Sequence, residues 1–135
     1  MIYLPDTNVW IRLLNKGGNL VKQHFEEVNP SEIRLCSVVK AELYFGAEKS
    51  NRRDENMETI EALFFDIKSL EFDDLAAKQY GIIRSDLETS GVVIGPNDLM
   101  IASIGLAHDI TVVTHNTKEF SRVSGLHIED WEVDG

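Results

Sequence analysis

Short apolar segments alternate along this chain with amphipathic helical patterns, and this alternation limits the folds it can adopt. The segments expected to form strands are 1–4, 33–39, 67–72, 111–114 and 126–131. Strands that are apolar along their whole length, with helices between them, are typical of a parallel sheet covered on both faces. The sequence therefore predicts an α/β fold with three layers, α/β/α, around a central and mostly parallel sheet.

The intervals between these segments carry helix signals. Asp6 is expected to cap a first helix that ends before Gly17, and Asp73 or Asp74 is expected to cap a long helix. Apolar residues at helical spacing predict further helices over 20–28, 40–46, 56–64 and from Asn97 onward.

Length and composition indicate one ordinary globular domain over residues 1–135. The hydrophobic fraction is 43%, and no apolar run approaches the length needed to span a bilayer. Cys36 is the single cysteine and is expected to be a small buried side chain. No basic segment precedes an apolar one at the N-terminus, so we expect a cytoplasmic protein without a secretory signal or membrane association.

The charge balance is strongly acidic. Thirteen Lys and Arg residues stand against 23 Asp and Glu residues, which gives a net charge of -10. This excess argues against non-specific binding to duplex nucleic acid, which needs a basic surface. It allows an enzyme whose carboxylates hold a cation that meets a phosphate, and it allows recruitment of a basic protein partner.

Acidic and amide side chains follow several of the predicted strands. They are Asp6 after the first strand, Glu42 in the helix after the second, Asp98 after the Gly95-Pro96 loop, and Asn116 and Glu119 after the 111–114 strand. Sites in parallel sheets form beyond the carboxyl ends of the strands, so we expect these side chains to converge. Like charges gathered in one place need a neutralising cation, and Mg²⁺ or Mn²⁺ prefers such oxygen ligands.

Each acid also has a purely structural interpretation. Asp6 can cap the first helix, and Asp98 can interact with the dipole at a helix N-terminus. Glu42 and Glu119 can be ordinary solvated residues. Taken singly these interpretations are favoured, and the shared position at the strand ends is what weakens them.

Four blocks of the sequence resemble the PIN-domain ribonucleases, and among them most closely the VapC toxins of bacterial toxin–antitoxin pairs. The blocks are PDTN at 5–8, SVVKAELYFG at 37–46, IGPNDLMIA at 94–102 and VTHNTKEFSRVSGL at 113–126, with EDW at 129–131. They lie in the family's order and cover nearly the whole chain. Pro5 and His115 depart from the usual residues of the family, but neither change removes an expected ligand.

The resemblance implies a PIN-like α/β/α domain that binds one or two Mg²⁺ or Mn²⁺ ions and cleaves RNA internally. By position, Asp6, Glu42 and Asp98 correspond to the family's catalytic, metal-binding acids. Asn116 falls where many members carry a fourth Asp, and in this interpretation Glu119 supplies the missing negative charge. In-line attack by an activated water then leaves 5′-phosphate and 3′-hydroxyl ends.

Several neighbouring residues are candidates for supporting roles. Thr7 and Asn8 are expected to hydrogen-bond Asp6 or the phosphate, with helix capping as the alternative. Thr114 is a candidate for orienting the water or a ligand carboxylate, and Arg84 for contacting RNA, with solvation as its alternative. The four histidines show no spacing typical of metal ligands. Trp10 and Trp131 are expected to pack in the core and at the edge of the sheet, with base stacking as the alternative.

The resemblance also implies partners. These are a transfer or ribosomal RNA substrate, a second copy of the chain in a homodimer, and an antitoxin whose basic or aromatic segment enters the active-site groove, with a larger toxin–antitoxin assembly as a further possibility.

A haloacid-dehalogenase-like phosphatase is disfavoured, because that class needs an Asp where this chain has Asn8. A phosphorylated receiver domain is also disfavoured, because this chain shows neither the acidic pair near its start nor the Lys late in the fold that such domains need. A catalytically weakened RNA- or protein-binding module stays open because of Asn116.

Overall fold

The computed structural model describes residues 1–133, which form short strands joined by helices. The strands are β1 (Tyr3–Pro5), β2 (Leu35–Cys36), β3 (Ser69–Leu70), β4 (Thr111–Val113) and β5 (Ile128–Glu129). The helices are α1 (Thr7–Leu14), α2 (Leu20–Glu27), α3 (Ser37–Lys49), α4 (Arg53–Phe65), α5 (Asp74–Thr89), α6 (Pro96–His108) and α7 (Thr117–Phe120), with one 3-10 turn, η1 (Pro30–Glu32).

All strand pairs in the described residues are parallel. The strands β1, β4 and β5 form one ladder, and β2 and β3 form another. A parallel bridge between Tyr3 and Ile33 joins the two ladders, and the Arg34 N–H donates to the Tyr3 carbonyl at 2.8 Å. The strand order is therefore β3-β2-β1-β4-β5, and the carboxyl ends of β1 and β4 lie side by side.

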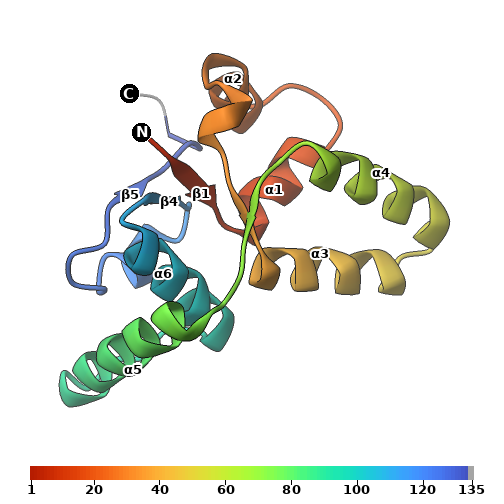
Figure 1. Ribbon diagram of the computed structural model, residues 1–135. Helices are drawn as coiled ribbons and strands as arrows, with labels where there is room; N and C mark the ends of the chain where they lie inside the picture. Colours follow the sequence, from red (N-terminus) through yellow and green to blue (C-terminus); the bar gives the residue numbers. More distant parts are fainter. Residues whose placement is uncertain (134–135) are drawn as a thin grey trace.

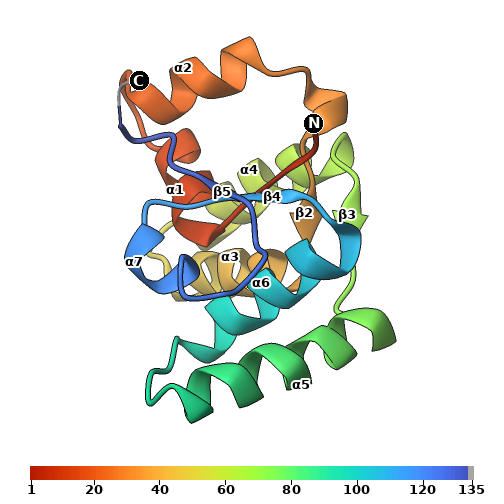
Figure 2. The ribbon, with the colours of Figure 1, turned by 90° about the vertical axis from the view of Figure 1, so that its left-hand side faces the viewer.

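Helices cover the strands on opposite sides. Figure 2 shows α1 and α2 above the strands and α5 and α6 below them. The helices α3 and α4 pack against each other as a hairpin that extends to the right in Figure 1. The predicted three-layer α/β/α arrangement around a parallel sheet is confirmed.

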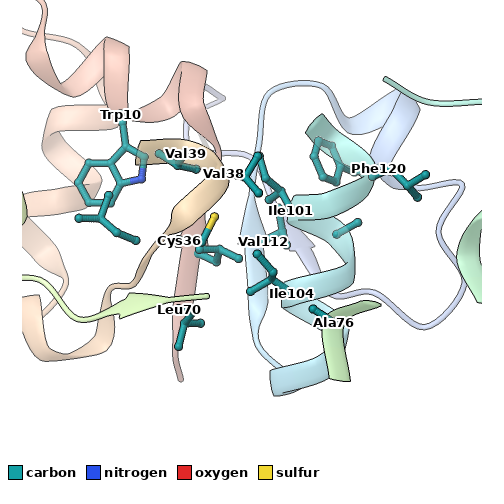
Figure 3. Packing of buried hydrophobic residues seen from close by; sticks show 14 of the residues in the cluster. Trp10, Cys36, Val38, Val39, Leu70, Ala76, Ile101, Ile104, Val112 and Phe120 are labelled. Atoms are coloured by element: carbon teal, nitrogen blue, oxygen red, sulfur yellow. The ribbon is translucent and has the colours of Figure 1, made fainter. Parts of the chain in front are cut away.

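The core lies where α6 and the start of α3 pack on the strands. Figure 3 shows Cys36 of β2, Val112 of β4 and Ile104 of α6 together in this region, and all three are fully buried. The prediction that Cys36 is a buried small side chain is confirmed. Trp10 and Trp131 are also buried, as expected of packing residues.

The main error of the sequence prediction concerns the segment 33–39. Its strand, β2, comprises only Leu35 and Cys36, and Ser37 already begins α3. A continuous apolar run does not distinguish a buried strand from a buried first helical turn, and here Val38 and Val39 face the core from that turn. The predicted strands over 67–72 and 126–131 likewise shrink to β3 and β5, and helix α7 was not predicted.

Helix caps follow the expected residues. The Asp6 carboxylate accepts a hydrogen bond from the Val9 N–H at 3.1 Å, and Asp73 rather than Asp74 caps α5 through the Ala76 N–H at 3.0 Å. Helix α6 begins at Pro96, one residue earlier than predicted. No helix within residues 1–133 combines the length and apolar character needed to cross a bilayer.

Gly105 allows α6 to approach β4 closely. A β-carbon at Gly105 would lie 2.8 Å from Val112 Cγ2 and 3.2 Å from Leu126 Cδ1. We therefore expect Gly105→Ala to lower the free energy of unfolding, measured by urea denaturation, by about 1–3 kcal/mol through overpacking. Gly81→Ala is the control, because a β-carbon there meets nothing within 4 Å. It should leave stability unchanged or raise it by up to about 1 kcal/mol. Equal effects of the two substitutions would contradict the close packing.

Candidate active site

The candidate site lies beyond the carboxyl ends of β1 and β4. Asp6 directly follows β1, and its N–H donates to the carbonyl of Val113, the last residue of β4, at 2.9 Å. Asp98 is the third residue of α6, and Glu42 lies in the second turn of α3. Three separate segments thus deliver one carboxylate each to this edge of the sheet.

Asp6 is both a helix cap and a buried acid. Its exposed fraction is 5%, and besides the Val9 N–H its side chain is hydrogen-bonded to Thr114. Burial raises the pKa of Asp6, the two hydrogen bonds lower it, and the charges of Glu42 and Glu132 raise it again. The interpretation of Asp6 as a helix cap is therefore confirmed, and its role as a metal ligand stays a prediction.

Thr7 holds Glu42. The Thr7 hydroxyl donates to Glu42 Oε1 at 2.6 Å, across 35 residues of sequence. The expectation that Thr7 would bond Asp6 is thus replaced by a contact that positions Glu42. Among the described residues, this is the one hydrogen bond of the Glu42 side chain. Asn8, the next residue, is exposed at the edge of the site.

Asn116 and Glu119 form a second group around Asp98. The Asn116 Nδ2 donates to Glu119 Oε2 at 2.7 Å and to Asp98 Oδ2 at 3.3 Å. Glu119 Oε1 accepts from the Gly95 N–H at 2.7 Å. These two hydrogen bonds lower the pKa of Glu119, Asn116 having the larger effect. Both Glu119 oxygens are thus used to fix Asn116 and the loop that leads into α6.

Thr114 connects the two groups. It is completely buried, it is hydrogen-bonded to Asp6, and its hydroxyl accepts from the Asn116 N–H at 2.9 Å. Its role in orienting the attacking water or a ligand carboxylate stays a prediction.

The electrostatics show that the acids are close enough to repel one another. The pKa of Asp98 is raised to about 6, first by burial and then by the negative charges of Asp6, Glu119 and Glu42. A hydrogen bond from Asn116 opposes the rise. Asp98 is therefore the carboxylate on which the other predicted acids of the site act.

The donor chemistry fits a hard divalent cation. The side chains of Asp6, Asp98 and Glu42 offer only oxygen atoms, which Mg²⁺ and Mn²⁺ prefer. Within residues 1–133, no three acids, histidines or cysteines already surround a common point. Binding of Mg²⁺ or Mn²⁺ stays a prediction.

Arg84 lies outside this cluster, on α5. Its Nε donates to Glu88 Oε2 at 2.8 Å, and its Nη1 donates to the Tyr80 hydroxyl at 3.2 Å. Its contact with RNA stays a prediction.

A hollow of about 490 Å³ adjoins Asp6 and Asn116 on the side of Arg12 and His115. His115 Nδ1 lies 3.0 Å from Asp130 Oδ2, and this contact is the main cause of a raised pKa of His115. Arg12 Nε lies 3.0 Å from Glu132 Oε1. The acidic partners of Arg12 and His115 follow β5, far along the chain, so no local sequence pattern indicates these contacts.

A family model described as the PIN domain matches residues 3–126, which include every carboxylate of the cluster. The chain belongs to the PIN-domain family. The resemblance seen in the four sequence blocks is thereby confirmed.

Curated relatives of this PIN domain are VapC ribonucleases. Ribonuclease VapC2 of Rickettsia felis is 35% identical over 133 residues, covering 98% of this chain and 99% of the relative. A tRNA(fMet)-specific endonuclease VapC of Shigella flexneri is 37% identical over 129 residues, covering 96% and 97%.

Solved structures give the same result. VapBC2 of Rickettsia felis bound to a promoter DNA fragment matches with a TM-score of 0.89 at 34% identity, covering 97% of this chain and 99% of that one. The DNA-bound VapBC of Salmonella typhimurium matches with a TM-score of 0.90 at 34% identity, covering 97% and 98%. The fold of this PIN domain is thus that of toxin chains solved together with their antitoxins.

The raised pKa of Asp98 predicts how the stability of the fold changes with pH. The folded protein binds the proton of Asp98 more tightly than the unfolded chain does, because the pKa is raised from 3.8 to about 6. The stability that this proton provides is present below pH 3.8 and is lost as the pH rises through about 6. In buffer with EDTA, Asp98→Asn should therefore be more stable than the wild type at pH 7, by about 1–2 kcal/mol after allowance for solvent screening of a partly exposed group.

The difference should close as the pH falls from 6 to 3.8, which urea denaturation at several pH values would measure. A variant less stable than the wild type at neutral pH would show that Asp98 is not under electrostatic stress.

Proposed function

We propose that this PIN domain is a metal-dependent endoribonuclease and acts as the toxin of a toxin–antitoxin pair. The observation that carries the proposal is the hydrogen-bond network that brings Asp6, Glu42 and Asp98, from three distant segments, to one edge of the sheet. The raised pKa of Asp98 supports it. Membership of the PIN-domain family and full-length similarity to VapC ribonucleases support the same reaction.

The residues divide into ligands and groups that hold them. Asp6 and Asp98 would hold the divalent cation, Mg²⁺ or alternatively Mn²⁺, with Glu42 binding directly or through water. When bound, the cation supplies positive charge against the phosphate and makes a water acidic enough to attack. Thr7 fixes Glu42 at Oε1, and Oε2 would then be the atom that contacts the cation or its water.

Neutral donors keep the ligands in place during the reaction. Thr114 orients Asp6, and Asn116 orients Asp98 while Glu119 orients Asn116. In this account Asn116 and Glu119 position the ligands more than they bind the cation, although both stay candidates for the outer ligand shell. Such support matters because a displacement of about 1 Å at reacting groups lowers rates roughly a hundredfold.

The substrate we propose is a structured RNA, with transfer RNA as the first candidate and ribosomal RNA as the second. The proposal rests on relatives whose names specify tRNA(fMet), from Shigella flexneri and Salmonella typhimurium. The acidic total charge of -10 also favours a substrate recognised in a defined cleft over general attraction of nucleic acid.

The partner we propose is an antitoxin that covers the cleft, bound to a homodimer of this chain. Structural relatives of this PIN domain are VapBC complexes, from Rickettsia felis, Salmonella typhimurium and Haemophilus influenzae. An acid-rich cleft attracts a basic segment, so inhibition by occupation of the site has an electrostatic basis.

The decisive test is cleavage of full-length tRNA(fMet) by the purified chain with Mg²⁺ or with EDTA. Asp6→Asn should reduce the rate by roughly a hundredfold or more, because it removes a charge that acts directly on the reaction. Asp86→Asn, an exposed acid on α5, is the matched control and should cleave at the wild-type rate. Circular dichroism would verify that both variants are folded.

The ends of the products test the chemistry separately. Attack by water predicts 5′-phosphate and 3′-hydroxyl ends, which sequencing by end-specific ligation identifies. A 2′,3′-cyclic phosphate, or cleavage that EDTA leaves unchanged, would refute the proposed reaction. Binding of RNA without any cleavage would instead favour the weakened binding module that Asn116 leaves open.

A further inference from the structure

A hollow of about 640 Å³ opens beside Glu42, on the side of Asp6 away from β5. Its lining includes Thr7 and Asn8 of α1, Glu42 and Phe45 of α3, and Asn97 and Met100 of α6. Thr7 and Glu42 belong to the candidate site, so the hollow is continuous with the place where the chemistry is proposed.

Phe45 is the unusual residue of this hollow. Its side chain is 63% exposed, although a phenylalanine of a helix normally packs inward. Val38, Ala41, Glu42 and Phe45 follow one another at helical spacing, which places them along one face of α3. Phe45 thus lies one turn beyond Glu42 on the face that lines the hollow.

The other residues that line the hollow could contact one face and one edge of a planar, polar ring. Ile11 and Met100 add apolar surface, while Asn8 and Asn97 add amide groups that both donate and accept hydrogen bonds. Lys49 Nζ lies 5.2 Å from the centroid of the Phe45 ring and gives this rim a positive charge. Apolar faces with amides and a nearby cation are what unstacked bases on a phosphate backbone require.

We propose that this hollow is a nucleobase subsite, in which the base next to the cleaved phosphate stacks on Phe45. The inference rests on the proposed RNA-cleaving function and adds a specific contact to it. It also gives the substrate strand a path across the site. The base lies toward α3, and the backbone passes Asp6 toward Arg12 and His115.

The test is a binding measurement that does not depend on cleavage. A short fluorescein-labelled oligoadenylate and an abasic strand of the same length are titrated with the protein in EDTA, and Kd is read from fluorescence anisotropy. Phe45→Ala should weaken oligoadenylate binding by about five-fold to a hundredfold, the range of base–aromatic stacking, and should not change abasic binding. Phe45→Tyr should retain the wild-type affinity.

Phe65→Ala is the matched control, because Phe65 is 87% exposed at the end of α4 and lines no part of the hollow. It should leave both Kd values unchanged. The subsite is refuted if the wild type binds the two strands equally or binds neither, or if Phe45→Ala weakens both to the same extent.

Protein occupants of the same face give different results. If Phe45→Ala leaves RNA binding intact and instead weakens antitoxin binding, or shifts a dimer toward monomer in sedimentation velocity, the hollow is a protein contact and the proposal is wrong. Cleavage of tRNA(fMet) by the wild type with Mg²⁺ is scored separately. A protein that shows base-dependent binding through Phe45 but no cleavage keeps the subsite and loses the enzymatic proposal.

Discussion

Repulsion between the carboxylates that gather beyond the carboxyl ends of β1 and β4 determines how the rest of this site is built. Asp6 is buried, and Asp98 is partly buried within reach of the charges of Asp6, Glu42 and Glu119. Burying several like charges together lowers the stability of the fold unless neutral hydrogen-bond donors or a cation compensate them. The fold supplies hydrogen bonds to these carboxylates from the side chains of Thr7, Thr114 and Asn116 and from the backbone N–H groups of Val9 and Gly95. The cation is the part that we propose.

The supporting contacts also explain the tolerance for an amide at position 116. An Asp in that position would add a fourth charge next to Asp98, whereas Asn116 donates a hydrogen bond to it. Glu119 keeps the negative charge one helical turn away and uses it to fix the Asn116 amide and the Gly95 loop.

Much of this could be predicted from the sequence. Apolar strands separated by helices predicted the parallel sheet, and the rule that sites form at strand ends placed Asp6, Glu42 and Asp98 together. Element boundaries were less predictable, because Val38 and Val39 are as apolar in a helical turn as in a strand. The Thr7–Glu42 contact and the Arg12–Glu132 pair join residues far apart in sequence, so no local pattern indicates them. Phe45 carried no signal at all, since only its exposure distinguishes it.

Binding of a divalent cation by Asp6 and Asp98 together can be measured by anomalous scattering from crystals of the protein grown with Mn²⁺. We expect a peak between the carboxylates of Asp6 and Asp98, with Glu42 near it, and the loss of that peak in Asp6→Asn. A well-ordered site without a peak, or a peak at other residues, would contradict it.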